Sequence, residues 1–492
     1  MTTSSEPAAS HAGWHFDNSY ARLPEVFCTR VNPTPVAKPR LVLFNRPLAQ
    51  SLGLDPATFA DPDAAVIFTG NQIPPGAEPI AQAYAGHQYG NLTRLGDGRA
   101  ILLGEQLTPA GERFDIQLKG SGPTPYSRSG DGRAALGPML REYLISEAMH
   151  ALGIPTTRSL AVASTGEPVF RGEPLPGAVL TRIAASHIRV GTFEFFAAIG
   201  DTDSLRVLAN HTILRHFPDR GNSEHPALGL LEEITERQAS LIAHWMRVGF
   251  VHGVMNTDNT ALSGETIDYG PCAFVDAYDP AAVFSSIDRH GRYAFGQQPH
   301  IAAWNLARLA EALLPVLHPE PETALARANE LLESFEGRFR RHWLAAMRGK
   351  LGLFSEEADD ASLVEELLRW MQRARADYTH TFRNLRRNTF AKPAPPTDDA
   401  FSAWHRRWTE RLARQPQSPT EVARRMDAHN PAVIPRNHVV EAALAAAAGN
   451  NLAPMERMLT ALAAPYDEAG QPAELLNPPP PGTPACRTFC GT

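Results

Sequence analysis

The chain has 492 residues, of which 43% are hydrophobic and 20% are charged, and its formal net charge is −7. This composition is ordinary for a globular protein that buries its core without disulfide bonds or structural metals, and the negative charge argues against nucleic acid as a partner. No apolar run approaches the roughly 18 residues of a membrane-spanning helix, and the first residues lack the pattern of a secretory signal. We therefore expect a cytoplasmic protein with no membrane partner.

Composition and periodicity divide the chain into four parts of an α+β protein. They are an N-terminal extension packed on a larger body (1–75), a β-rich lobe with one clear helix (76–188), a mostly helical lobe (189–473) and a proline-rich tail (474–492). Within the helical lobe, residues 302–317 and 362–378 carry apolar side chains at helical spacing. The stretch 392–399, rich in proline and aspartate, is expected to be a loop.

The tetrapeptide GDGR occurs twice, at residues 96–99 and 130–133. The first copy lies between two apolar runs, a pattern that predicts a β-hairpin. Gly96 and Gly98 would let backbone N–H groups approach an anion, and Arg99 adds a donor fork suited to phosphate. A plain surface hairpin is the alternative, and the motif taken alone favours that alternative.

A strand and a helix follow the first GDGR copy. Apolar and polar residues alternate from Phe114 to Lys119, which predicts a half-buried strand with Lys119 at its end. Protein kinases place their phosphate-binding lysine on the strand after a glycine-rich hairpin, and a glutamate on the next helix holds its ammonium group. We expect Glu142 to take that role, with Glu147 as the alternative. A solvated lysine and a surface glutamate are the other interpretation.

Two arginines, Arg182 and Arg189, lie among apolar residues in the stretch LTRIAASHIRVGTFEFF. Each guanidinium could grip a polyphosphate with two hydrogen bonds. A pair of structural arginines is the alternative, and without further context it is the simpler interpretation.

The most specific pattern is VHGVMNTDNTALSGETIDYG, residues 251–270. Protein kinases carry H-R-D-L-x-x-x-N followed by D-F-G. His252, Asn259 and Asp268 fit the histidine, the asparagine and the D-F-G aspartate. Val254, however, stands where the catalytic base of a kinase should be.

The segments DNTAL and TIDYG are predicted to pair as a short hairpin around the turn LSGET. This hairpin would bring Asn259 and Asp268 together as oxygen ligands for a Mg²⁺ ion shared with a triphosphate. Asp258, one position before Asn259, could supply the missing base. A polar hairpin stabilised by Asx turns is the alternative.

Taken together, these segments resemble the selenoprotein O family. The resemblance rests on RLGDGRA, DIQLKGSGPTPYSRSGDGRAALGPMLREYLISEAMHALGIPTTRSL, SHIRVGTFEFF, FVHGVMNTDN and TIDYGPCAF, and it covers about residues 80–305 before continuing through the helical C-terminal half. It implies a protein-kinase-like bilobal fold that binds ATP in an orientation flipped relative to kinases. It also implies transfer of AMP from ATP, with UTP as an alternative nucleotide, to Ser, Thr or Tyr hydroxyls of protein substrates, with release of pyrophosphate.

The resemblance also implies roles for individual residues. The implied nucleotide-binding residues are Gly96, Gly98, Arg99, Lys119, Asp131, Gly132, Arg182, Arg189 and Asp268. The implied catalytic residues are Lys119, its partner Glu142, and Asp258 as proton acceptor, and the implied ligands of Mg²⁺ or Mn²⁺ are Asn259 and Asp268. Two alternatives stay open: a kinase-like phosphotransferase with Asp258 as its base, and a nucleotide-binding pseudokinase without catalysis. Retention of Lys119, Asn259 and Asp268 argues against the second.

The four cysteines, Cys28, Cys272, Cys486 and Cys490, are too few and too scattered for a disulfide framework. Family members that contain selenocysteine carry it third from the C-terminal end, where Cys490 stands. Cys486 lies four residues earlier, which departs from the C-x-x-U spacing of those members. We expect Cys490, on a mobile tail, to exchange with a redox partner, for which Cys272 is the candidate within this chain.

Overall fold

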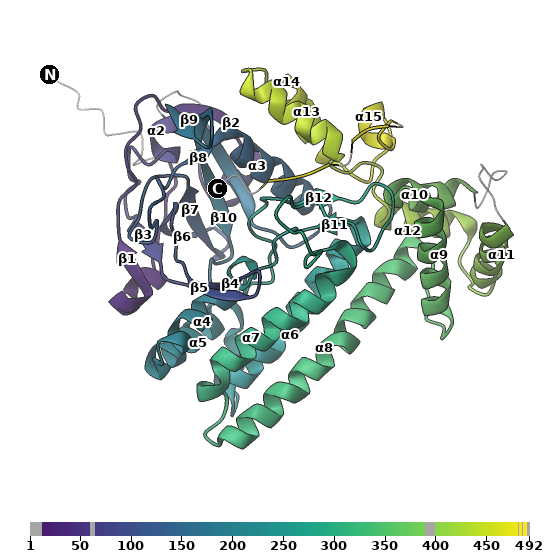
Figure 1. The fold of residues 1–492 in the computed structure, drawn as a ribbon, viewed down its shortest axis with the longest axis horizontal. Coiled ribbons are helices and arrows are strands. Elements are labelled where there is room, and N and C mark those ends of the chain that lie inside the picture. Colours follow the sequence, from purple (N-terminus) through teal and green to yellow (C-terminus); the bar gives the residue numbers. More distant parts are fainter. Residues whose placement is uncertain (1–11, 60–63, 389–398, 481, 485, 490–492) are drawn as a thin grey trace.

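The computed structural model describes residues 12–59, 64–388, 399–480, 482–484 and 486–489 (Figure 1). Its strands are β1 Cys28–Arg30, β2 Arg40–Phe44, β3 Ile80–Gln82, β4 Ala85–Gln88, β5 Asn91–Arg94, β6 Ala100–Leu107, β7 Arg113–Lys119, β8 Ala134–Ala135, β9 Arg158–Phe170, β10 Pro174–Ala184, β11 Phe250–Val251 and β12 Ala273–Phe274. Its helices are α1 Arg46–Ser51, α2 Ala65–Phe68, α3 Leu136–Ala151, α4 Val190–Ala198, α5 Thr202–His216, α6 Pro226–Val248, α7 Gln298–Leu317, α8 Pro321–Lys350, α9 Asp360–Ala374, α10 Tyr378–Asn388, α11 Asp399–Ala413, α12 Pro419–His429, α13 Asn437–Ala448, α14 Ala453–Leu462 and α15 Ala473–Leu476. All but the last residue of the loop expected at 392–399 lies outside the described residues.

The largest sheet has eight strands. Seven follow the order β1-β3-β6-β7-β10-β9-β2, and β8 pairs with β10. Strand β7 lies between β6 and β10, which confirms the strand predicted at 114–119. It is not half-buried, however. Its polar residues Asp115, Gln117 and Lys119 are buried as well. Their side chains form hydrogen bonds and ion pairs with groups of other elements and therefore do not need contact with water.

The N-terminal segment contributes directly to this sheet. Strands β1 and β2 form its two edges, whereas residues of α1 and α2 pack in one apolar cluster with Ile116 and Leu118 of β7. Asn45 begins α1 by accepting a hydrogen bond of 3.1 Å from the Leu48 N–H, as an N-cap residue does. The segment is thus part of the central sheet as well as an extension packed on it. The division of the chain into four parts remains a proposal.

The hairpin predicted at the first GDGR motif is wrong. The motif connects β5 to β6, but β5 pairs with β4 in a separate small sheet, while β6 pairs with β3 and β7. Asp97 is held by strand β3 and not by a hairpin partner, because its carboxylate accepts a hydrogen bond of 3.1 Å from the Gln82 N–H. Position 96 still requires a glycine, because its φ is 96°. Pairing with distant strands therefore outweighs the local turn preference.

The hairpin predicted for DNTAL and TIDYG is also wrong. Thr257–Asn259 form a 3-10 turn, Ala261 bridges to Arg189, and Thr266 bridges to Thr156. Each half of the expected hairpin therefore pairs with a different preceding segment. A short isolated two-stranded ribbon is marginally stable, so partners already anchored in the fold are favoured over it.

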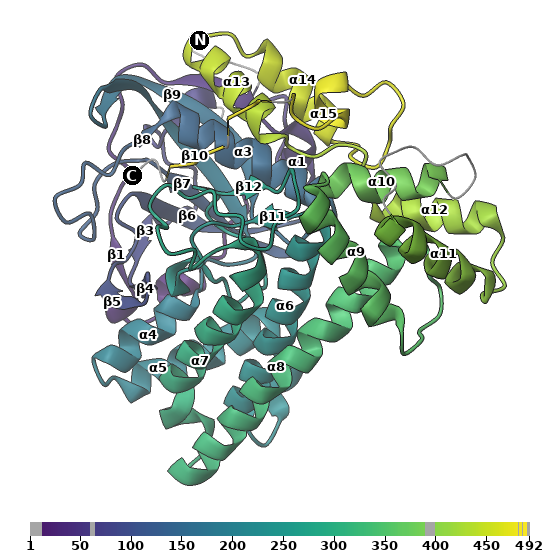
Figure 2. The same cartoon turned by 45° about the vertical axis from the view of Figure 1, so that its right-hand side comes forward.

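The long helices α6, α7 and α8 form a bundle (Figures 1 and 2). Helices α6, α7 and α8 pack together with α4 and α5 beside them, and α13 and α14 pack on α3. The helix predicted at 302–317 lies within α7. The helix predicted at 362–378 is interrupted, because α9 ends at Ala374, Arg375 adopts a φ of 50°, and α10 begins at Tyr378.

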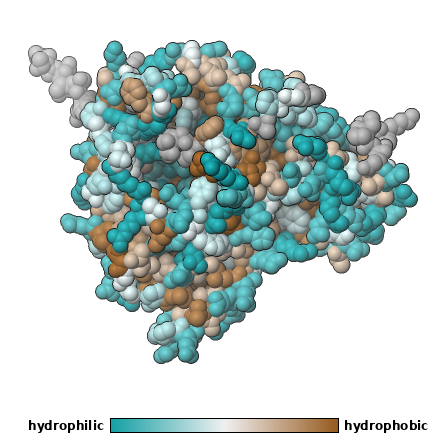
Figure 3. Space-filling view, viewed as in Figure 1, coloured by the Kyte–Doolittle hydropathy of each residue, from teal (hydrophilic) through white to brown (hydrophobic). Residues whose placement is uncertain are grey.

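Polar side chains cover most of the face seen in Figure 3, and apolar side chains occur there in separate groups. Among the described residues, no helix combines the length and the apolar character needed to cross a bilayer.

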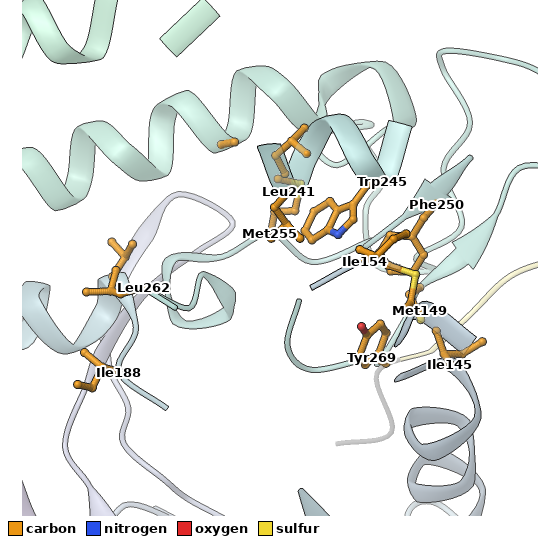
Figure 4. Close-up of a cluster of buried hydrophobic side chains, with 14 of the residues drawn as sticks. Ile145, Met149, Ile154, Ile188, Leu241, Trp245, Phe250, Met255, Leu262 and Tyr269 are labelled. Carbon is orange, nitrogen blue, oxygen red and sulfur yellow. The ribbon is translucent and has the colours of Figure 1, made fainter. Parts of the chain in front are cut away.

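A buried apolar cluster fixes the segment that carries the D-Y-G motif. Figure 4 shows Trp245 of α6, Phe250 of β11 and Tyr269 among its members. The Trp245 indole N–H donates a hydrogen bond of 2.8 Å to Thr266 Oγ1. Because large aromatic side chains bury extensive surface, the backbone next to Asp268 is held in one position.

Candidate active site

One cavity of about 420 Å³ brings the predicted site residues together. Its walls come from both GDGR motifs, from β7 and β10, and from residues 254–268. The predicted residues that line it are Gly96, Gly98, Arg99, Lys119, Asp131, Gly132, Arg182, Arg189, Asp258, Asn259 and Asp268. Glu142 is outside this lining and reaches the site through Lys119.

Four side chains form a charged network beside the cavity: Lys119, Glu142, Arg182 and Asp268. Lys119 Nζ donates to Glu142 Oε2 at 2.7 Å and also bonds to Asp268 Oδ1. Arg182 Nε donates to Glu142 Oε1 at 2.7 Å, and Arg182 Nη2 donates to Asp268 Oδ1 at 3.2 Å. Two cations and two carboxylates are therefore balanced against one another.

Neighbouring elements bring this network together. Lys119 ends β7, Arg182 lies on the adjacent strand β10, and Glu142 comes from α3. Glu142 is 2% exposed. Burial disfavours its charged form, but Arg182 and Lys119 outweigh burial and lower its pKa. Glu147, the alternative partner for the lysine, instead binds Arg158 at 2.6 Å.

Asp268 combines an unusual backbone with a strongly acidic side chain. Its φ of 68° lies in the left-handed region, which is uncommon for residues other than glycine, although aspartate adopts it more readily than most. Burial opposes ionisation of its carboxyl group, but Lys119 and Arg182 outweigh it and hold its pKa well below the usual range. The carboxylate is thus ionised at neutral pH, as a metal ligand must be.

Asn259 and Asp268 both line the cavity and both carry side-chain oxygens of the kind that binds hard cations. Asn259 Nδ2 donates to the Val254 carbonyl at 3.1 Å, which leaves Asn259 Oδ1 as an acceptor. Over the described part of the chain, no group of three or more His, Cys, Asp or Glu side chains could hold a metal by itself. One carboxylate and one amide oxygen therefore suit a hard cation whose remaining ligands are phosphate oxygens and water.

Asp258 lines the same cavity and has the properties of a proton acceptor. Its side chain is buried, and its Oδ1 has no hydrogen-bond partner among the described residues. Burial raises the pKa of Asp258 to about 7, which suits proton transfer near neutral pH. Gly86 makes room for the carboxylate, because a Cβ at that position would collide with it. Val254 also lines the cavity.

Arg189 contacts Asp97 and Tyr84, two residues that the sequence analysis did not identify as site residues. Its Nη1 donates to the Asp258 carbonyl at 3.0 Å, and its Nη2 lies 3.7 Å from Asp97 Oδ1. The guanidinium lies over Tyr84, 4.5 Å from the ring centroid. Asp97 and Tyr84 both line the cavity. Asp97 belongs to the first GDGR copy, so the repeated motif was an available signal, whereas no motif marks Tyr84.

The second GDGR copy lies at an exposed part of the cavity. The Asp131 carboxylate accepts two hydrogen bonds of 2.9 Å from the Arg171 guanidinium, and its side chain is 46% exposed. Gly132 has a φ of 65°, and a Cβ there would collide with the backbone of Gly122. Arg171, which lies between β9 and β10, is a further lining residue that the sequence did not indicate.

The predicted redox element is only partly described. Cys490 lies outside the described residues. Cys272 is buried, and burial raises its pKa to about 12, which disfavours the thiolate needed for disulfide exchange. The expectation of a mobile tail is wrong at Thr488, because its N–H donates to the Phe284 carbonyl at 2.9 Å and its hydroxyl donates to the Pro271 carbonyl at 2.7 Å.

Comparison with known proteins agrees with the resemblance inferred from the motifs. A family model described as protein adenylyltransferase SelO matches residues 12–463. The chain is 58% identical over 482 residues to the protein nucleotidyltransferase YdiU of Syntrophotalea carbinolica, with 98% of each chain covered. It is also 58% identical over 482 residues to the YdiU protein of Geobacillus kaustophilus, covering 98% of this chain and 100% of the relative.

These matches define an enzyme of the nucleotidyltransferase class. The chain belongs to the SelO family.

Proposed function

We propose that this enzyme transfers AMP from ATP to Ser, Thr or Tyr hydroxyls of protein substrates. The observation that carries the proposal is that the displaced carboxylate Asp258 shares one cavity with seven arginine and lysine side chains of the described residues. Four of them, Arg99, Lys119, Arg182 and Arg189, are the cations predicted from the sequence. Even with Lys119 and Arg182 balanced by Glu142 and Asp268, these side chains offer more phosphate-binding donors than transfer of a γ-phosphate requires. It suits a site that holds a pyrophosphate leaving group while the α-phosphorus is attacked.

The proposed step moves one proton and exchanges one bond. Asp258 accepts the proton of the acceptor hydroxyl as the hydroxyl oxygen attacks the α-phosphorus. The bond between the α-phosphorus and the oxygen bridging to the β-phosphorus breaks, and that oxygen leaves with the pyrophosphate. Lys119 and Arg182, oriented by Glu142, would meet the negative charge of the leaving group.

A divalent cation belongs to the same proposal. Asn259 and Asp268 would hold Mg²⁺ or Mn²⁺, which supplies charge compensation for the triphosphate. The remaining residues proposed to bind the nucleotide are Gly96, Gly98, Asp131 and Gly132. UTP is proposed as an alternative nucleotide, and a protein-kinase-like bilobal arrangement is the fold proposed around the site.

Mass spectrometry tests this proposal. The enzyme and a mixture of protein acceptors are incubated with ATP and Mg²⁺, and modified peptides are mapped. We expect AMP on Ser, Thr or Tyr in the wild type. Asp258→Asn, which removes the proton acceptor while keeping the side-chain shape, should form it about 10² to 10⁴ times more slowly. Phosphate in place of AMP would favour the alternative, a phosphotransferase that uses the same base.

A further inference from the structure

The residue before Asp258 is held by a group of hydrogen bonds that we call the Thr257 network. It joins His87 of β4, Glu194 of α4 and Thr257 of the 3-10 turn. The Thr257 hydroxyl donates to Glu194 Oε2 and accepts a hydrogen bond of 2.7 Å from the His87 backbone N–H. His87 Nδ1 lies 2.5 Å from Glu194 Oε1. Three elements that are distant in sequence therefore meet at one hydroxyl group.

The network depends on both capacities of that hydroxyl, to donate and to accept. Thr257 is 0% exposed, so its hydroxyl group has no contact with bulk water. Valine has nearly the same shape but can neither donate nor accept. A valine at this position would leave Glu194 Oε2 and the His87 backbone N–H without the hydrogen bonds that Thr257 makes, which is costly. A serine would keep the hydroxyl.

Close packing links the position of Thr257 to that of Asp258. A Cβ on Gly86 would collide with the Asp258 carboxylate. A Cβ on Gly191, the second residue of α4, would collide with the Ala85 carbonyl and lie 3.4 Å from the Asp258 Cα. Strand β4, helix α4 and the turn thus meet without spare space, so a shift of the turn also displaces the carboxylate.

We propose that Thr257, held by His87 and Glu194, is a positioning residue that places the Asp258 carboxylate for proton transfer. The proposal rests on the proposed function, because it requires Asp258 to act as the base. Lys119, which is proposed to bind the phosphates of ATP, is oriented by Glu142 and not by the Thr257 network. Loss of the Thr257 network is therefore expected to lower kcat by more than it lowers ATP affinity.

The test compares Thr257→Val with Thr257→Ser in the full chain. Initial rates are measured with ATP carrying label at the α- or the γ-phosphate, and ATP affinity is measured by calorimetry. We expect Thr257→Val to lower kcat roughly 10- to 100-fold, the range for a misplaced catalytic group, with a much smaller change in the Kd for ATP, because only Asn259 of the proposed metal ligands lies in the same turn. Thr257→Ser should restore most of the rate.

A matched control removes another buried hydroxyl. Thr235 of α6 is also 0% exposed, and its hydroxyl donates to the Leu231 carbonyl at 2.7 Å within the helix. Thr235→Val should keep the wild-type kcat. An equal fall in kcat for Thr235→Val would show that any buried threonine has this effect, and it would overturn the proposal.

Other outcomes also decide the question. Wild-type kcat in Thr257→Val, equal losses in the valine and serine variants, or an equal fall in ATP affinity and kcat would each overturn the positioning role. If Thr257→Val does not fold, Glu194→Gln replaces it. The expected result is then a fall in kcat larger than the fall in ATP affinity, and wild-type kcat would contradict the proposal. If the wild-type enzyme transfers only the γ-label, AMP transfer is contradicted, while the comparison of the Thr257 variants still tests the placement of Asp258. Transfer of neither label would overturn both.

Discussion

Replacing Glu142 by alanine is expected to destabilise the protein strongly, because its carboxylate is enclosed between two buried cations. Its oxygens lie 2.7 Å from Lys119 Nζ and 2.7 Å from Arg182 Nε. Without Glu142, these two cations share the single carboxylate of Asp268. Removing one partner from a buried ion pair costs about 3–5 kcal/mol. We expect a loss of that size in the free energy of unfolding, measured by urea titration.

Glu147, on the same helix, provides the control. Its side chain and that of its partner Arg158 are 16% and 20% exposed, so water can replace part of what Glu147→Ala removes. The expected loss is about 1–2 kcal/mol. Calorimetry should also show that Glu147→Ala keeps ATP affinity and that Glu142→Ala loses it, because Lys119 is no longer oriented. Equal losses of stability, or normal ATP affinity in Glu142→Ala, would refute this reasoning.

Three further predictions concern the base, the metal ligand and a buried histidine. Asp258→Asn should retain ATP affinity in calorimetry but lower turnover by about 10² to 10⁴, and loss of ATP affinity would count against its role as base. Asp268→Ala should lose metal-dependent ATP binding, because the triphosphate charge is left uncompensated; normal affinity in the presence of Mg²⁺ would contradict the metal assignment. Burial lowers the pKa of His187 to about 4, so between that value and its ordinary pKa only the unfolded chain takes up a proton, and stability falls as the pH decreases. From pH 7 to pH 5 the wild type should lose about 2 kcal/mol more than His187→Asn in urea unfolding, and equal losses would contradict the pKa.

Several features of the site could be predicted because they depend on neighbours in the sequence. The alternation from Phe114 to Lys119 predicted β7 and placed Lys119 at its end. Protein kinases hold this lysine with a glutamate of the next helix, and that order suggested Glu142 as its partner. The structure contains this ion pair, although its catalytic role remains a prediction.

Other features depend on contacts that local patterns do not encode. Both hairpins were predicted from turn residues, but distant strands and bridges determine the course of the chain at Asp97 and at Ala261. Arg171 reaches Asp131 across 40 residues of sequence. The Thr257 network joins residues that are as many as 170 positions apart. No periodicity marks such pairs, because they form only when separate elements pack together.

The origin of the transferred group distinguishes AMP transfer from phosphate transfer. The enzyme is incubated with Mg²⁺ and a protein acceptor, in parallel with ATP labelled at the α-phosphate and ATP labelled at the γ-phosphate, and the protein-bound label and the released pyrophosphate are measured. AMP transfer predicts protein label from the α-phosphate only, with one pyrophosphate released for each label bound. Label from the γ-phosphate, without release of pyrophosphate, would contradict the account and show that Asp258 serves a phosphotransferase.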